Sequence, residues 1–271
     1  EEIPVYYRSV NYVQDTKWVI DQSSLELLKL AVKESWLVKK FPFSKSLPEL
    51  QRYPLGNDRR KYSELDEEDK ALVKEWKLVN EILQEEIVAQ KSKMLSINSA
   101  INIAERYKDL EGIWFPHSVD YRGRVYPEPV ILNPQGSDAI KFLLKLGNPE
   151  PLRGDRAVRW AKIHIANLYG KDKLSYDDRE SWFNENEDLI IRVGTNPISS
   201  EEWYDVDKPW QFVQVCQEWV KYKHDSEAPV SILVAMDGSC SGIQHFSAML
   251  RDPEGGASVN LLPSEKPKLY A

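Results

Sequence analysis

The most informative stretch of this chain is an apolar run that leads into an aspartate: Val230-Ser231-Ile232-Leu233-Val234-Ala235-Met236-Asp237-Gly238-Ser239-Cys240-Ser241-Gly242. The β-branched and apolar residues after Pro229 predict a buried strand, and an amphipathic helix is predicted from about Ile243. Two interpretations of the junction are open. Asp237 is either a functional acid held at the tip of a strand, or the cap of the helix that follows it.

An acid placed rigidly at the end of a strand suits phosphoryl transfer. That chemistry holds two Mg²⁺ ions about 3.5–4 Å apart, with carboxylates and substrate phosphates as ligands. Gly238 has no side chain, so substrate and metal can approach the backbone, and its carbonyl is a further candidate ligand. The functional interpretation therefore makes Asp237 and Gly238 the metal-binding residues.

The composition sets few limits on function. The chain has 271 residues, 42% of them hydrophobic and 29% charged, which is typical of a soluble globular protein with one large domain or two small ones. The net charge of −7 argues mildly against nucleic-acid binding, because phosphate contacts normally come from a basic surface. Basic residues nevertheless gather at Arg59-Arg60-Lys61 and at Arg122 and Arg124, so the total charge leaves the question open.

The two cysteines and the apolar runs bear on the compartment. Cys216 and Cys240 lie outside any CxxC or Cys/His pattern, so a zinc site is not expected. Two cysteines in a chain of this length are typical of a reducing compartment. No run approaches the roughly 20 apolar residues of a membrane span, and the first residues do not resemble a signal peptide. We expect a cytoplasmic protein with no membrane partner.

Hydrophobic periodicity predicts an α+β, mainly helical fold. A long helix is predicted over 66–108, with Ser63 as its N-cap and Asp66 and Glu67 in an acidic first turn. At about 1.5 Å per residue it is roughly 64 Å long, so it projects from a globule or spans one, as a core helix or a coiled-coil arm. Further helices are predicted over 15–40, 153–170, 177–192 and 209–222, and a short buried strand over 113–115.

A second block of interest lies upstream: Trp114-Phe115-Pro116-His117-Ser118-Val119-Asp120-Tyr121-Arg122-Gly123-Arg124-Val125-Tyr126. Gly123 permits close backbone approach, Arg122 and Arg124 can fork to phosphates, and Tyr126 can stack on a base. By itself an Arg-Gly-Arg triplet is more typical of surface ion pairs.

Both blocks resemble the single-subunit RNA polymerases of bacteriophages and mitochondria. The sequence from Asp237 to Asp252 resembles motif A of that family, and Asn260-Leu261-Leu262-Pro263-Ser264-Glu265 continues the likeness. The segment Asp120-x-x-Gly123-Arg124 resembles the family's DxxGR element, and Asn133-Pro134-Gln135-Gly136 extends it.

The resemblance implies roles for several residues. It makes Asp237 one of two aspartates that bind the catalytic Mg²⁺ ions, with Gly238 assisting. It places the DxxGR element against the template and the hybrid, and gives nucleic-acid contacts to Asp120, Arg122, Gly123, Arg124, Tyr126, Ser239 and Ser241.

Gly242 bears on the choice between RNA and DNA. The related DNA polymerases carry a glutamate five residues after the motif A aspartate, which obstructs the 2′-hydroxyl of a ribonucleotide. In this chain that position is Gly242, so the resemblance implies that ribonucleotides are admitted and disfavours a DNA polymerase. His245 is either a nucleotide contact or an ordinary helix residue.

The resemblance also implies a right-hand polymerase fold with thumb and front palm, and fingers absent. Its parts are a lead-in segment (1–23), thumb-like helices (24–112), the front half of the palm (113–262) and the start of the fingers (263–271). The second aspartate and the fingers are expected on a larger partner chain, as in the heterodimeric phage polymerases of this family.

Two alternatives stay open beside this split polymerase: a truncated fragment of a full-length polymerase, and a non-catalytic nucleic-acid-binding subunit. The implied ligands are DNA template, RNA product and nucleoside triphosphates, with two Mg²⁺ ions shared with the partner chain. A template-opening or loading factor is also expected. If the protein is viral, its compartment is the cytoplasm of an infected bacterial host.

Overall fold

The structure of the chain is a computed structural model, and it describes residues 4–38, 41–42, 47–57, 60–234 and 240–263. These parts are mainly helical with a few short strands, which confirms the predicted α+β, mainly helical class. The helices are α1 (Val5–Gln14), α2 (Gln22–Glu34), α3 (Glu67–Tyr107), α4 (Asp138–Lys141), α5 (Gly154–Ala166), α6 (Tyr176–Glu185), α7 (Glu187–Thr195), α8 (Pro209–His224), α9 (Ser241–Leu250) and α10 (Pro253–Ser258). A 3₁₀ turn η1 (Tyr62–Glu64) precedes α3, and a π-helical turn η2 (Asn167–Lys171) continues α5.

The strands form three small antiparallel sheets within the described ranges. They are β1 (Trp18–Ile20) with β6 (Leu144–Leu146), β2 (Leu37–Val38) with β3 (Phe41–Pro42), and β4 (His117–Val119) with β5 (Val125–Pro127). In the first sheet Trp18 lies opposite Leu146, so the start of the chain is joined to its middle.

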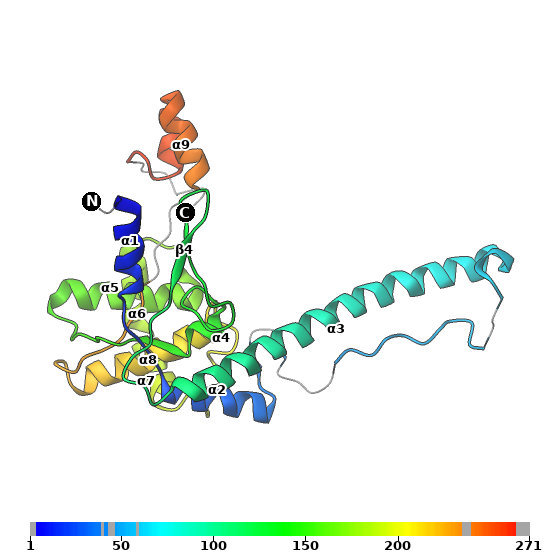
Figure 1. The fold of residues 1–271 in the computed structure, drawn as a ribbon, viewed down its shortest axis with the longest axis horizontal. Coiled ribbons are helices and arrows are strands. Elements are labelled where there is room, and N and C mark those ends of the chain that lie inside the picture. Colours follow the sequence, from blue (N-terminus) through cyan, green and yellow to red (C-terminus); the bar gives the residue numbers. More distant parts are fainter. Residues whose placement is uncertain (1–3, 39–40, 43–46, 58–59, 235–239, 264–271) are drawn as a thin grey trace.

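Most helices gather in one body, and α3 extends from it as a long arm (Figure 1). The segment 47–57 runs outward along this arm toward its tip, and α3 then returns from the tip to the body. Helix α1 and the hairpin of β4 and β5 rise from one side of the body, and α9 lies farther out in the same direction.

The predicted long helix is confirmed, with a different cap. Asp66 is the N-cap, because its side chain accepts a hydrogen bond from the Asp69 backbone N–H at 2.8 Å. Ser63 lies one turn earlier, in η1. Forty-one residues at about 1.5 Å each make α3 roughly 62 Å long. Segment 47–57 is fastened to the arm where the Trp76 indole N–H donates to the Gln51 carbonyl at 2.9 Å.

The helix predicted over 15–40 is only partly present. Residues Trp18–Ile20 form β1, and α2 starts at Gln22 because Asp21 occupies its N-cap position. Ser35 then ends α2 in the left-handed conformation, with φ of 58°. The short helix α1 was not predicted. Its apolar and aromatic side chains are almost all exposed, so α1 does not have the one-sided buried face that a periodic sequence pattern reveals.

Other elements also differ from the prediction. The helix predicted over 177–192 is two helices, α6 and α7, which meet at Asn186. Residues 113–115 form no strand: Ile113 makes an isolated bridge with Trp18, and Trp114 is 55% exposed. The helix over 209–222 is confirmed as α8, and the one over 153–170 as α5 with η2.

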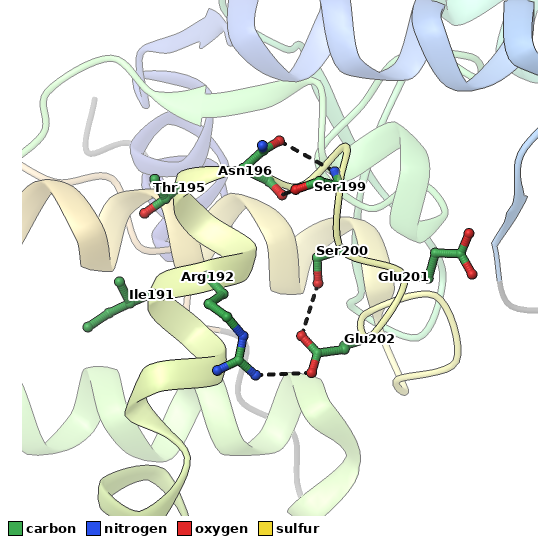
Figure 2. A pocket seen from close by; sticks show the side chains of 8 residues that line it. All are labelled: Ile191, Arg192, Thr195, Asn196, Ser199, Ser200, Glu201 and Glu202. Atoms are coloured by element: carbon green, nitrogen blue, oxygen red, sulfur yellow. Dashed lines mark hydrogen bonds and ion pairs between the residues drawn. The ribbon is translucent and has the colours of Figure 1, made fainter.

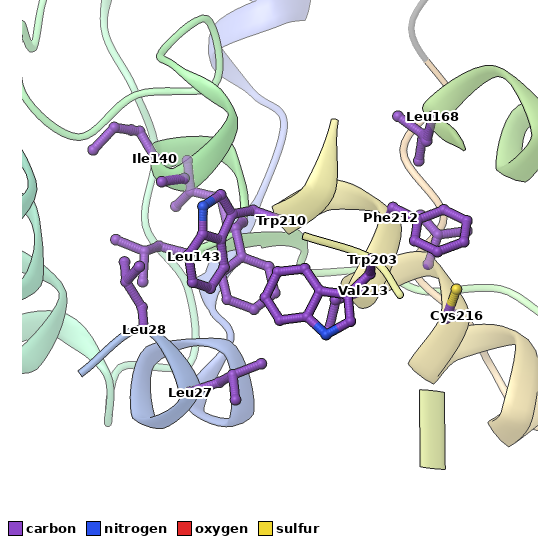
Figure 3. Close-up of a cluster of buried hydrophobic side chains, with 14 of the residues drawn as sticks. Leu27, Leu28, Ile140, Leu143, Leu168, Trp203, Trp210, Phe212, Val213 and Cys216 are labelled. Carbon is purple, nitrogen blue, oxygen red and sulfur yellow. The ribbon is translucent and has the colours of Figure 1, made fainter. Parts of the chain in front are cut away.

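The core lies where α2, α7 and α8 meet the segment around β6 (Figure 3). Trp203 and Trp210 pack edge to face, with ring centroids 5.3 Å apart, and the Trp203 indole N–H donates to the Pro197 carbonyl at 3.0 Å. Fully burying an aromatic ring contributes about 2–3 kcal/mol. Many of the aromatic residues are therefore core mass. No helix in the described ranges is both long and apolar enough to span a membrane.

Candidate functional site

The hairpin of β4 and β5 carries the DxxGR element at its tip. The Asp120 carboxylate accepts hydrogen bonds from the backbone N–H groups of Arg122 at 2.9 Å and Arg124 at 3.0 Å. The Gly123 N–H donates to the Asp120 carbonyl at 2.9 Å, and Gly123 has φ of +77°, which favours glycine. Asp120 and Gly123 therefore build the loop.

Arg122 is held within the same loop. Its guanidinium contacts the Asp120 carboxylate at 2.7 and 2.8 Å and donates to the Tyr126 hydroxyl at 3.2 Å. Partial desolvation raises the pKa of Asp120, but the hydrogen bonds from Arg124 and Arg122 outweigh it, so the pKa is lowered overall. The ion pair predicted as the alternative for an Arg-Gly-Arg triplet is thus present for Arg122.

Arg124 and Tyr121 are the groups that the loop presents outward. The Arg124 side chain is exposed and makes no hydrogen bond or ion pair with any residue that the structure describes. Tyr121 is 96% exposed, and the Arg122 guanidinium lies 5.5 Å from its ring centroid. Tyr121 was missed as a site residue, although an aromatic residue beside two arginines is itself a signal for base stacking.

Two glutamine side chains fix the hairpin to the body. The Gln14 side chain on α1 accepts the His117 backbone N–H at 2.8 Å, and the Gln135 amide donates to the Val125 carbonyl at 3.0 Å. Asn133 folds the loop that carries Gln135, since its side chain accepts the Gln135 N–H at 2.9 Å and donates to the Pro129 carbonyl at 2.9 Å. The Asn-Pro-Gln-Gly segment therefore supports the DxxGR hairpin.

Asp237, Gly238 and Ser239 lie outside the described residues, so their predicted roles stay predictions. The predicted strand before them is not observed as a strand. Val230 makes an isolated bridge with Glu150, and residues 231–234 belong to no strand.

The segment before Asp237 is nevertheless fastened to the body. The Val230 N–H donates to the Glu150 carbonyl at 3.0 Å, and the Ser231 N–H donates to the Glu218 carboxylate at 2.8 Å. The Ser231 hydroxyl accepts the Leu146 N–H at 3.0 Å. Buried His164 on α5 hydrogen-bonds the backbone of Leu233.

A small cavity brings this segment and the Asn-Pro-Gln-Gly loop together. It has a volume of about 160 Å³ and is lined by Trp18, Pro134, Lys141, Leu144, Gln211, Leu233 and Val234. Pro134 precedes Gln135, which holds the hairpin, and Val234 lies three residues before Asp237. Residues Pro134 and Val234, 100 positions apart, therefore line the same cavity.

Helix α9 follows Asp237 and carries the remaining predicted residues. Ser241, Gly242 and His245 are exposed, and a Cβ built on Gly242 meets no atom of the described residues within 4 Å. The role of Gly242 in admitting ribonucleotides stays a prediction. Elsewhere in the body, burial lowers the pKa of His164, on α5, to about 4.

A larger cavity, of about 520 Å³, lies beside α7 (Figure 2). Two of its charged groups are paired: Arg192 contacts Glu202 at 3.0 Å, and Ser200 donates to the same carboxylate at 3.1 Å. The cavity is lined by none of the site residues predicted from the sequence, so it is not the candidate site. The described part of the chain contains no group of three or more His, Cys, Asp or Glu side chains placed to hold a metal ion.

Comparison with known proteins finds similarity to RNA polymerases over almost the whole chain. Residues 151–270 match the family described as DNA-dependent RNA polymerase. The chain is 38% identical over 264 residues to the DNA-directed RNA polymerase of Enterobacteria phage T3 and 36% identical to T7 RNA polymerase of Escherichia phage T7; each alignment covers 97% of this chain and 29% of the relative. The DNA-directed RNA polymerase 1, mitochondrial, of Arabidopsis thaliana is 31% identical over 98% of this chain and 27% of its own length.

The chain thus spans less than a third of the relatives that it matches, but almost all of it is matched. This chain belongs to the family of DNA-dependent RNA polymerases of the phage and mitochondrial type.

Proposed function

We propose that this chain supplies part of the nucleotidyl-transfer site of a DNA-directed RNA polymerase, with Asp237 as one of its two metal-binding aspartates. The observation that carries the proposal is the fastened segment 230–234, which leads directly into the motif-A-like sequence. Asp237 follows Leu233 by four positions in the sequence, which is at most about 14 Å along an extended chain.

Asp237 and the Gly238 carbonyl are the residues of this chain that would hold Mg²⁺. Their oxygen donors suit this hard cation, which takes carboxylate, carbonyl and phosphate ligands. When bound, two Mg²⁺ ions neutralise charge on the reacting phosphates. The second aspartate comes from another part of the polymerase in this proposal.

The hairpin positions the nucleic acid. Arg124 has a free guanidinium for a phosphate, and the exposed ring of Tyr121 offers a stacking surface, with Tyr126 beside it. Asp120, Arg122 and Gly123 shape the loop that presents these groups. Ser239 and Ser241 are further contacts to the strand that lies over the motif.

The reaction is attack of the RNA 3′-hydroxyl on the α-phosphate of a nucleoside triphosphate, with pyrophosphate as the leaving group. This chain binds and orients the reactants. Open space at Gly242 admits the 2′-hydroxyl of a ribonucleotide, and exposed His245 lies one helical turn away on the same helix.

The remaining domain assignments are also proposals. Segment 24–112, with its projecting helix α3, is the thumb that grips the product duplex, and 113–262 is the front of the palm. Residues 1–23 lead in from an N-terminal region, and 263–271 begin the fingers.

A larger second chain with the fingers completes the site in this proposal. It is supported by α9, whose apolar side chains face outward: Ile243, Phe246, Met249 and Leu250 are 40–76% exposed. Apolar patches of this kind mark surfaces that contact another protein surface. A loading factor would present the template, and the enzyme would work in the cytoplasm of an infected bacterial host.

Nucleotide incorporation on single-stranded template tests the function. Asp237→Ala is expected to lower turnover by about 10³-fold or more while template binding stays intact. Asp205→Ala, at an exposed aspartate before α8, is the matched control. Full activity of Asp237→Ala would leave a nucleic-acid-binding subunit as the better description.

Assay of this chain with and without the remainder of the polymerase tests the split arrangement. Robust Mg²⁺-dependent synthesis by this chain alone would exclude it. Weighing the subunits of the native complex separates a two-chain enzyme from a fragment of one long chain.

A further inference from the structure

A buried ion network lies beneath the segment that precedes Asp237. The Lys145 ammonium contacts the Asp21 carboxylate at 2.9 Å and the Glu218 carboxylate at 2.8 Å. The side chains of Asp21, Glu218 and Lys145 are only 6%, 7% and 18% exposed. None of the three belongs to the family-like blocks, and the proposed chemistry does not use them.

The network connects elements that are far apart in the sequence. Asp21 is the N-cap of α2, Lys145 lies in the middle of β6, and Glu218 lies on α8. Gln214, also on α8, donates to the Asp21 carboxylate at 3.2 Å. The hydroxyls of Ser23 and Ser24 donate to the same group at 2.7 and 2.6 Å.

The Glu218 carboxylate connects the ion network to the segment before Asp237. One oxygen contacts Lys145, and the other accepts the Ser231 backbone N–H at 2.8 Å. The Ser231 hydroxyl accepts the N–H of Leu146, the residue after Lys145, at 3.0 Å. Lys145 and Ser231 are therefore joined twice, through Glu218 and through the β6 backbone.

Stability alone is a weak reason for burying such a network. Desolvation of buried charges offsets most of their attraction, and apolar residues of the same volume often stabilise a fold as well. Removal of one partner is different, since it leaves a buried charge uncompensated. The network carries one positive and two negative charges, so without Lys145 two carboxylates would face each other with no counter-ion.

We propose that Lys145 is a positioning residue for the metal-binding acid: it balances the charge of the buried carboxylates, so that Glu218 keeps its hydrogen bond to Ser231, six residues before Asp237. This inference rests on the proposed role of Asp237. In support, desolvation lowers the pKa of Lys145, but the attraction of Asp21 and Glu218 outweighs it and the pKa is raised overall. The ammonium therefore stays charged in its buried site.

A positioning residue affects the rate through the placement of the reacting groups, rather than through the affinity for substrate. A displacement of about 1 Å at a reacting group can lower turnover by up to about 10²-fold. A loosened Ser231 anchor displaces the start of the segment that carries Asp237, and so weakens the hold on Mg²⁺. The nucleotide and template contacts are made elsewhere, so their affinities are not affected.

Three variants of the complete polymerase test the inference. Lys145→Met is expected to lower kcat about tenfold or more and to raise the Mg²⁺ concentration for half-maximal rate, with KM for nucleotides within about twofold. The double variant Asp21→Asn/Lys145→Met keeps the net charge of the network at −1. It is expected to restore most of the parent kcat and most of the parent Mg²⁺ requirement. Lys173→Met, at a surface lysine whose side chain is 73% exposed, is the matched control.

Amide hydrogen exchange gives a second readout, independent of activity. Exchange of the Ser231 and Leu233 amides is expected to accelerate in Lys145→Met and to slow again in the double variant. If Lys145→Met does not fold, Glu218→Ala replaces it, because it removes the acceptor of the Ser231 N–H and leaves Lys145 paired with Asp21. An unchanged Mg²⁺ requirement in Glu218→Ala would then overturn the inference.

The outcomes separate this inference from the proposed function. If Asp237→Ala abolishes synthesis while Lys145→Met leaves the Mg²⁺ requirement and the exchange rates unchanged, only the role of Lys145 is overturned. If Asp237→Ala keeps full activity, the proposed function fails, and with it the idea that the network positions that acid. Failure of the double variant to recover also counts against charge balance as the cause.

Discussion

The carboxylate of Asp120 accepts the backbone N–H of Arg124 at 3.0 Å, so an acid shapes the loop that presents a basic side chain. At the surface proposed to bind phosphate, an unpaired carboxylate would be unfavourable. The charge of Asp120 is instead balanced by hydrogen bonds from two backbone N–H groups and from Arg122. Arg124 is left as the cation that faces outward.

Asp120→Ala is expected to weaken template binding about tenfold, because the loop loses three of the hydrogen bonds that fix its shape. Asp120→Asn keeps the oxygen that accepts from Arg122 and Arg124 and should retain more binding. Fluorescence anisotropy with labelled single-stranded template measures both. Equal losses in the two variants would show that the negative charge, rather than the loop shape, is what matters.

Arg124→Ala is expected to weaken binding to all template sequences alike and to reduce the salt dependence of binding by one phosphate contact, a slope change of about 1. Affinities at several salt concentrations give this slope. Arg156→Ala, at an exposed arginine on α5, provides the control. A sequence-dependent effect would point to base recognition by Arg124 instead.

Gly242→Glu is expected to lower kcat/KM for ribonucleotides by about 10²-fold or more relative to deoxyribonucleotides, because the new side chain would occupy the space that we propose for the 2′-hydroxyl of the incoming sugar. Gly242→Ala should fold and stay active, and should raise the free energy of unfolding by about 0.5–1 kcal/mol in this exposed helical position. Single-nucleotide incorporation assays compare the sugars. Unchanged sugar selectivity in Gly242→Glu would remove this residue from the nucleotide site.

Phe246→Asp/Met249→Asp is expected to weaken association of this chain with the rest of the polymerase by at least tenfold, since charges replace apolar groups at the proposed contact. Both side chains are exposed, at 63% and 71%, so folding of the chain itself should be little affected. Leu174→Asp, at an exposed leucine between η2 and α6, is the control. Analytical ultracentrifugation of the mixed chains measures the association; equal association of variant and parent would rule out α9 as the contact.

The stability of the chain is expected to fall at acid pH because of His164. Burial lowers the pKa of His164 from 6.5 to about 4 in the folded chain. Between pH 6.5 and 4 the unfolded chain binds a proton that the folded chain does not, so the free energy of unfolding falls as the pH falls through this window. The full loss below pH 4 is about 3 kcal/mol.

Denaturant unfolding of His164→Gln between pH 4 and 7 measures this contribution. The variant should show a flatter dependence of unfolding free energy on pH, whereas His224→Gln, at the exposed end of α8, should follow the parent chain. Parallel curves for parent and His164→Gln would place the acid sensitivity elsewhere.

Local interactions explain which features could be predicted from the sequence. Helix α3 has an unbroken apolar stripe and an acidic N-terminus, and both act within a few turns of the chain. The DxxGR turn is likewise local, because Asp120 bonds to residues two and four positions later. Helix α8 follows from its own apolar pattern. Asp237 was identified by its motif alone and lies outside the described residues, so its role remains a prediction.

The features that could not be predicted from the sequence depend on contacts between residues far apart in the chain. Trp18 continues a helical apolar pattern, yet it lies in a strand because its partner Leu146 is 128 positions away. Residues 177–192 keep an apolar periodicity, but the packing of α7 on α8 turns the chain at Asn186. Lys145 looks like any surface lysine in the sequence; only the fold encloses it between Asp21 and Glu218, because burial and charge pairing depend on which segments meet in space.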